Sequence, residues 1–173
     1  MDKVSTDELS ALSLPELASR LRDVHTMRTP IGWPTESAVT KSSIERRIIE
    51  IVTAETPENN PGGKESERIH CEVELKVRSG NRPSVKSSDL DLRPGALFVA
   101  VDAPFTIGEP VELEVETENH YKLRVRGNVG WVATGSKEQP AGVGVTFQSV
   151  VGDAAERRLH RLIIELVCNR IER

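Results

Sequence analysis

The side chains best suited to metal binding or nucleophilic catalysis do not fall into a recognised catalytic spacing in this chain. They are scattered along the sequence as His25, His70, His120, His160, Cys71 and Cys168. Metal sites and redox motifs need such residues at short, defined intervals. The chain also lacks a G-x-S-x-G turn, a Cys/His pair and a phosphate-binding Walker loop. We therefore predict that it is not an enzyme, holds no metal and carries no cofactor.

Composition and charge exclude two further classes of protein. Of the 173 residues 37% are hydrophobic and 29% charged, and the net charge is -4. Residues 1–64 carry 8 basic and 10 acidic side chains, and residues 65–173 carry 15 and 17. Nucleic-acid binders need a basic surface, so no nucleic-acid partner is predicted. No apolar run reaches the roughly 20 residues that span a bilayer, which predicts no membrane insertion. The polar start, residues 1–8, is unlike a signal peptide, so we expect a cytoplasmic protein.

The first part of the chain, residues 1–56, is predicted to be a helical extension. Ser13 and Glu16 fit a capping box, and apolar residues then recur at helical spacing from Leu14 to Val24. Prolines at 30 and 34 break the pattern before a second helix over about residues 36–54. Neither helix buries its apolar stripe alone, so we expect a helical hairpin. The pair either caps the rest of the chain, dimerises it or captures a partner. Residues 57–65, rich in Pro, Gly and Asn, predict a flexible linker.

After residue 65 the hydrophobic period changes from helical to two. Apolar and polar residues alternate in several short stretches separated by turn residues, over 71–77, 97–101, 111–115, 123–131 and 143–147. With no helix between them, these stretches predict an antiparallel sandwich or barrel. A wide apolar face from Leu159 to Ile171 then predicts a C-terminal helix.

Three motifs in this order resemble a PilZ domain, a bacterial module best known for binding cyclic di-GMP. They are D-L-R-P-G-A-L-F-V over residues 91–99, G-N-V-G-W over 127–131 and G-V-G-V-T-F over 142–147. The resemblance covers residues 66–173. It implies a mainly β fold: a six-stranded antiparallel barrel with a C-terminal helix, here preceded by the helical extension.

The departures lie in the motifs that hold the ligand in this family. The family's R-x-x-x-R pair aligns with Arg68 and Glu72, so an acid replaces the second arginine. Its D-x-S-x-x-G motif aligns with Asp91, Arg93 and Ala96, which keeps the aspartate and loses the serine and the glycine. A second register, with Asp89 on the aspartate and Asp91 on the serine, also lacks the glycine and adds two residues before the L-F-V strand.

These changes bear directly on how the nucleotide would be held. Arginine donates paired hydrogen bonds to phosphate and to guanine and stacks on its face. Glu72 has no donor and repels the ligand, and losing one such charged partner costs about 1.5–3 kcal/mol. Arg93 offers a replacement contact to phosphate. Ala96 weakens the site if its backbone needs a positive φ or a close approach. By residue type alone, Asp91 also suits a turn cap and Arg68 a solvated charge.

The resemblance implies a regulatory adaptor without catalytic activity. Our leading hypothesis is that it acts through protein–protein contacts in bacterial motility or envelope control, with weak or no cyclic di-GMP binding. Family members with altered motifs are associated with surface motility and type IV pili, so partners in motility or pilus machinery, or a second copy of the chain, are expected. The alternatives are a functional cyclic di-GMP receptor that uses Arg68, Asp91 and Arg93 in a variant site, and a purely structural subunit of an envelope or motility complex.

Overall fold

The computed structural model describes residues 6–30, 32–54, 67–116, 122–136, 140–147 and 153–168. Its four helices and six strands follow the order that the sequence predicts, helices first and last. The helices are α1 (Thr6–Ser10), α2 (Leu14–Thr26), α3 (Thr35–Thr53) and α4 (Asp153–Val167). The strands are β1 (Ile69–Arg78), β2 (Val85–Arg93), β3 (Ala96–Ala100), β4 (Pro110–Glu116), β5 (Lys122–Thr134) and β6 (Ala141–Thr146).

The six strands close into an antiparallel barrel in the order β1-β2-β3-β6-β5-β4. This confirms the predicted fold class, including the C-terminal helix and the N-terminal helices. Side chains alternate between the interior and the outer face, as the strict buried–exposed alternation of β1 shows. The interior is filled mainly by aliphatic side chains such as Leu75, Leu113 and Val145, which have at most 2% of their surface exposed.

Hydrophobic alternation in the sequence did not predict strand β2. β2 begins at Val85, but its first half is the polar run Lys86 to Asp89, and only Leu90, Leu92 and Arg93 in it are buried. A half-strand made almost entirely of polar residues carries no period-two hydrophobic signal. Pairing with β1 and β3, and not the local pattern, therefore defines β2.

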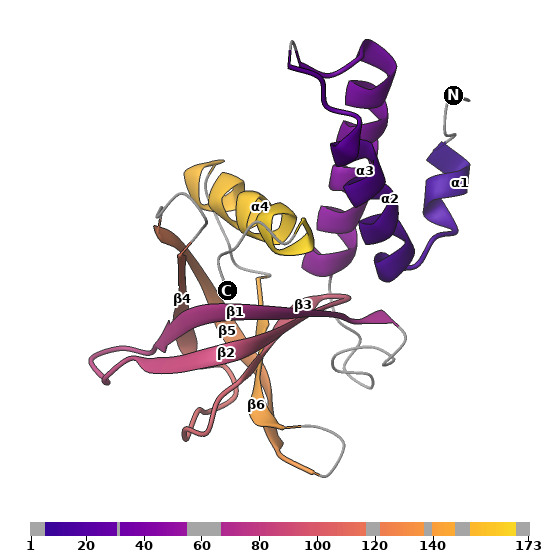
Figure 1. The fold of residues 1–173 in the computed structure, drawn as a ribbon. Coiled ribbons are helices and arrows are strands. Elements are labelled where there is room, and N and C mark those ends of the chain that lie inside the picture. Colours follow the sequence, from indigo (N-terminus) through magenta and orange to yellow (C-terminus); the bar gives the residue numbers. More distant parts are fainter. Residues whose placement is uncertain are drawn as a thin grey trace.

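The N-terminal helices form an antiparallel pair that stands beside the barrel (Figure 1). The capping box that starts α2 is formed: the Ser13 amide donates to the Glu16 carboxylate at 2.8 Å and the Ser13 hydroxyl does so at 2.7 Å. Buried residues on one face of each helix, such as Leu17, Leu21 and Ile48, join the same apolar core as the barrel. The pair thus buries its apolar stripes within its own chain.

The N-terminal helix pair, α2 and α3, contacts the rest of the chain through α3 and through α4. α4 lies across one end of the barrel (Figure 1), buries its apolar face, including Leu162 and Ile163, and contacts β1 and β5. α3 contacts α4 and also reaches β2 and β3. The Nε of Arg22 in α2 donates to the Val167 carbonyl at 2.9 Å, at the end of α4. The predicted linker, residues 57–65, lies outside the described residues.

Candidate functional site

The strand register of β1 and β2 determines which of the predicted site residues meet. Ile69 pairs with Leu92 and His70 with Asp91, so Arg68, one residue before β1, comes level with Arg93 at the end of β2. Because Ile69 and Cys71 point into the barrel, His70 and Glu72 lie on its outer face. Asp91 shares that face with its register partner His70.

Asp91 is at the centre of a small ionic cluster on this outer face. Its Oδ2 accepts a hydrogen bond from Nη2 of Arg93 at 2.8 Å, and its Oδ1 lies 3.0 Å from Nδ1 of His70. The side chain of Asp91 is 19% exposed, whereas that of His70 is 59% exposed. Both carboxylate oxygens of Asp91 are therefore engaged by neighbours within the chain.

Arg93 is buried although it carries a charge, with only 2% of its surface exposed. Its guanidinium carbon lies 4.3 Å from the centre of the Phe98 ring, a stacked cation–π contact. Desolvation lowers the pKa of Arg93, and the hydrogen bond to Asp91 acts in the opposite direction. The Nε atom has no hydrogen-bond partner among the described residues. The Nη2 atom of Arg93 is thus bonded to Asp91, and the face of its guanidinium is stacked on Phe98.

The turn between β2 and β3 explains the replacement at position 96. Arg93 pairs with Ala96, which leaves Pro94 and Gly95 as the two turn residues. Gly95 adopts a φ of 78°, the conformation that the third position of a type II turn requires. Ala96 is instead a fully buried strand residue. The positive φ therefore belongs to Gly95, and Ala96 meets no such demand.

The same turn is in contact with the N-terminal extension. The Gly95 amide donates a hydrogen bond of 2.8 Å to the carbonyl of Ile51, in the last turn of α3. The α3 helix also contacts both strands of this hairpin, β2 and β3. The Gly95 amide of this turn is therefore already bonded within the chain.

Glu72 does not join the other four predicted residues. It pairs with Asp89, four residues before Arg93, which is about 13 Å along an extended strand. Both side chains are exposed. Nε2 of His70 lies 3.8 Å from Asp89 and its Nδ1 lies 3.0 Å from Asp91, so the histidine lies between these two carboxylates. Glu72, as the register partner of Asp89, adds a third carboxylate to this face. The predicted site is thus divided into a buried arginine end and an exposed acidic end.

Sequence reasoning missed three contributors to this region: His70, Phe98 and Ile51. His70 had a usable signal, since it lies midway between Arg68 and Glu72 and shares their strand face. Phe98 was noticed only as part of a strand motif. Ile51 has no signal in the sequence, because the contact of α3 with a hairpin more than forty residues away depends on tertiary packing.

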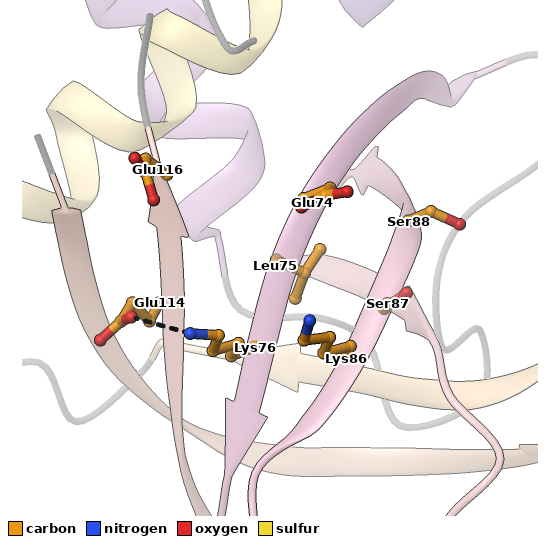
Figure 2. Close-up of a pocket in the computed structure, with 8 residues that line it drawn as sticks. All are labelled: Glu74, Leu75, Lys76, Lys86, Ser87, Ser88, Glu114 and Glu116. Atoms are coloured by element: carbon orange, nitrogen blue, oxygen red, sulfur yellow. Dashed lines mark ion pairs between the residues drawn. The ribbon is translucent and has the colours of Figure 1, made fainter. Parts of the chain in front are cut away.

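Hollows are also present elsewhere on the barrel surface. Figure 2 shows one of about 370 Å³ on the outer face of β1, β2 and β4. Lys76 and Lys86, a register pair, lie side by side there, and Lys76 Nζ is 3.9 Å from Glu114. The three glutamates of this pocket, Glu74, Glu114 and Glu116, outnumber its two lysines. None of the five predicted site residues lines this pocket.

The described part of the chain contains neither a metal-binding cluster nor a helix that could span a membrane. Its histidine, cysteine and acidic side chains form no group of three or more that is placed to hold a metal ion. Among the described helices, none has the length and apolar character needed to cross a membrane.

A family model described as the PilZ domain matches residues 64–165, which is more than half of the chain and includes all six strands and most of α4. No curated protein matches the chain.

Proposed function

Because this chain belongs to the PilZ domain family, whose members are regulatory binding and adaptor domains and not enzymes, we propose that it is a non-enzymatic adaptor. It acts through protein–protein contacts and binds cyclic di-GMP, the family's known ligand, weakly or not at all. By the resemblance of its altered motifs, its place is in bacterial motility or envelope control in the cytoplasm. Its partners are motility or pilus proteins or a second copy of itself.

The observation that carries this proposal is the state of Arg93. In the register that matches Arg93 to the family's serine, this residue is 2% exposed, paired with Asp91 at 2.8 Å and stacked on Phe98. To contact a phosphate it would have to leave both partners, and separating a buried pair leaves an uncompensated charge. Asp91, which matches the aspartate of the family motif in the same register, is occupied by the same contact.

Two further features support the same conclusion. The Gly95 amide is bonded to Ile51 of α3, so the hairpin turn has one donor fewer to offer a ligand. At the other end, Glu72, Asp89 and Asp91 gather three carboxylates on one face. A ligand with two phosphates meets repulsion there in place of the arginine fork that holds phosphate well.

The test is an isothermal titration of the full-length protein with cyclic di-GMP, with Arg68→Ala as the matched control. We expect no heat of binding and no thermal shift at high ligand concentration for either protein. Micromolar or tighter binding that Arg68→Ala abolishes would instead establish the alternative, a receptor with a variant site.

The adaptor role itself needs a second measurement. Crosslinking of the full-length protein in cells, followed by purification and identification of the crosslinked chains, should recover a defined protein partner. Failure to recover any stable partner, together with tight binding of the dinucleotide, would overturn the proposal.

A further inference from the structure

Away from the β2–β3 hairpin, two adjoining hollows form one groove on the outer face of β4 and β5. One, of about 570 Å³, extends to Arg158 and Leu159 of α4. The other, of about 490 Å³, extends to Arg78 and Gly80 at the end of β1. Both hollows share four lining residues: Pro110, Glu112, Arg124 and Arg126. We call this surface the arginine groove and define it by Arg78, Arg124, Arg126 and Arg158.

The guanidinium groups of this groove retain unused donors. Arg124 and Arg126 bond to Glu114 and Glu112 through Nε alone, at 2.7 and 3.2 Å. Their side chains are 56% and 87% exposed, so the terminal nitrogens face solvent. Arg78 and Arg158 make no hydrogen bond or ion pair to any described residue and are exposed. A planar guanidinium with free terminal nitrogens is suited to carboxylate recognition.

The acids on this face leave the groove with a net positive charge. Cross-strand pairs place β4 glutamates between cations: Arg78, Glu112 and Arg126 form one row, and Lys76, Glu114 and Arg124 form the next. Glu114 is already shared by Arg124, Lys122 and Lys76. Among the described residues that line the groove, Glu112 is the one acid against four arginines. The charge complement of this groove is therefore an anionic partner.

The spacing of the arginines indicates which kind of anion fits. Arg124 and Arg126 project from alternate positions of β5, about 7 Å apart. Carboxylates at alternate positions of an extended peptide repeat at the same distance. We propose that the arginine groove binds an extended, acidic segment of a protein partner, with glutamate or aspartate at alternate positions. This inference rests on the proposed adaptor function and names the chemistry of the partner.

A nucleic acid fits the groove less well than such a segment. Its phosphates form a continuous line of charge, whereas Glu112 and Glu114 interrupt the cations of this face. The chain as a whole is acidic, with a net charge of -4, and nucleic-acid affinity depends on a broad basic surface. Separate carboxylates match this surface better, because each can pair with one arginine of a row without facing the glutamate beside it.

The experiment measures binding of a fluorescein-labelled peptide of alternating glutamate and serine to the full-length protein by fluorescence anisotropy. The test variant is Arg126→Gln/Arg158→Gln. The matched control is Arg28→Gln/Arg157→Gln, which removes the same charge from exposed positions outside the groove. We expect the test variant to bind about tenfold more weakly and the control to bind like the wild type. Thermal melts of both variants verify that each is folded.

Two outcomes would overturn the inference. One is equal weakening by both variants, which would indicate attraction by net charge alone. The other is tighter binding of a labelled single-stranded oligothymidylate than of the peptide. Either result leaves the adaptor proposal standing, because that proposal fails only if the full-length protein binds cyclic di-GMP tightly and no partner is recovered.

Discussion

Arg93 and Asp91, two positions apart on β2, form an ion pair of 2.8 Å in which the arginine is buried and the aspartate is not. Both residues lie in the segment that resembles the family's D-x-S-x-x-G ligand motif. In this chain the contact between them contributes to the fold. Its contribution can be measured as stability.

Removing the carboxylate alone should be the most damaging change in this cluster. Asp91→Ala leaves the Arg93 guanidinium buried without a counter-ion, which we expect to lower the free energy of unfolding by about 3 kcal/mol or more. The double variant Asp91→Ala/Arg93→Met removes both charges and should recover most of the loss. Urea denaturation of both variants and of Arg93→Met completes the cycle. Additive losses would show that the two side chains are not coupled.

Gly142 is predicted to tolerate no side chain. A Cβ at this position would lie 2.3 Å from the Val99 carbonyl oxygen and 2.6 Å from Cζ of Phe98. Because the oxygen belongs to the paired strand β3, relief requires the backbone to move, and we expect Gly142→Ala to cost about 1–3 kcal/mol or more. Gly130→Ala is the control, since its nearest neighbour is a methyl group of Thr146. Equal losses from the two variants would contradict this reading of the packing.

The two cysteines should differ strongly in reactivity. Burial raises the pKa of Cys71 to about 12, from an ordinary value of 9.0. At about pH 8 only about one Cys71 in ten thousand is then a thiolate, the reactive form. Cys168 is half-buried, so a thiol reagent should label it first. Labelling of native Cys168→Ser is expected to be slow and to accelerate only when denaturant is added. Rapid labelling of that variant would mean that Cys71 is accessible.

Acid should weaken the loop around Glu109. Hydrogen bonds from the Ser79 hydroxyl and the Thr106 amide lower the pKa of Glu109 below its ordinary 4.5. Because the folded-state pKa is the lower one, this stabilisation is present above pH 4.5 and is lost as the pH falls through the folded-state value. Glu109→Gln should therefore reduce the difference in unfolding free energy between about pH 7 and about pH 3.5. Glu36→Gln, which alters an exposed glutamate on α3, should not.

Restoring the family motif should restore some affinity for cyclic di-GMP. The variant Glu72→Arg/Arg93→Ser/Ala96→Gly replaces all three departures at once. It restores the second arginine of the pair that begins with Arg68, and it frees Asp91, so we expect titration calorimetry to show at least about a tenfold gain over the wild type. No gain in a folded triple variant would show that the three side chains are not what limits binding.

The barrel was predictable from the sequence, and the state of its candidate site was not. Alternation along β1 and β4 specifies which residues face inward, and the family motifs indicate how many strands there are. Residue type predicts an exposed Arg93, since arginine is almost never buried unless it is paired. Its burial involves the ring of Phe98, which the pairing of β2 with β3 brings to it. Glu72 and Arg93 were assigned to one site, but strand register places them at opposite ends of it.

The hydrogen bond from Gly95 to Ile51 makes the hairpin turn and the N-terminal helices thermodynamically linked. Any molecule that needs the Gly95 amide competes with α3 for it, so its apparent affinity is reduced by the free energy that holds α3 in place. The reverse also holds. A partner that binds the helices in their docked position stabilises the hydrogen bond between Gly95 and Ile51. A partner that pulls the helices away breaks this bond and exposes the Gly95 amide. The helical extension is thus a tethered competitor, and its effective concentration at the turn is set by the chain itself.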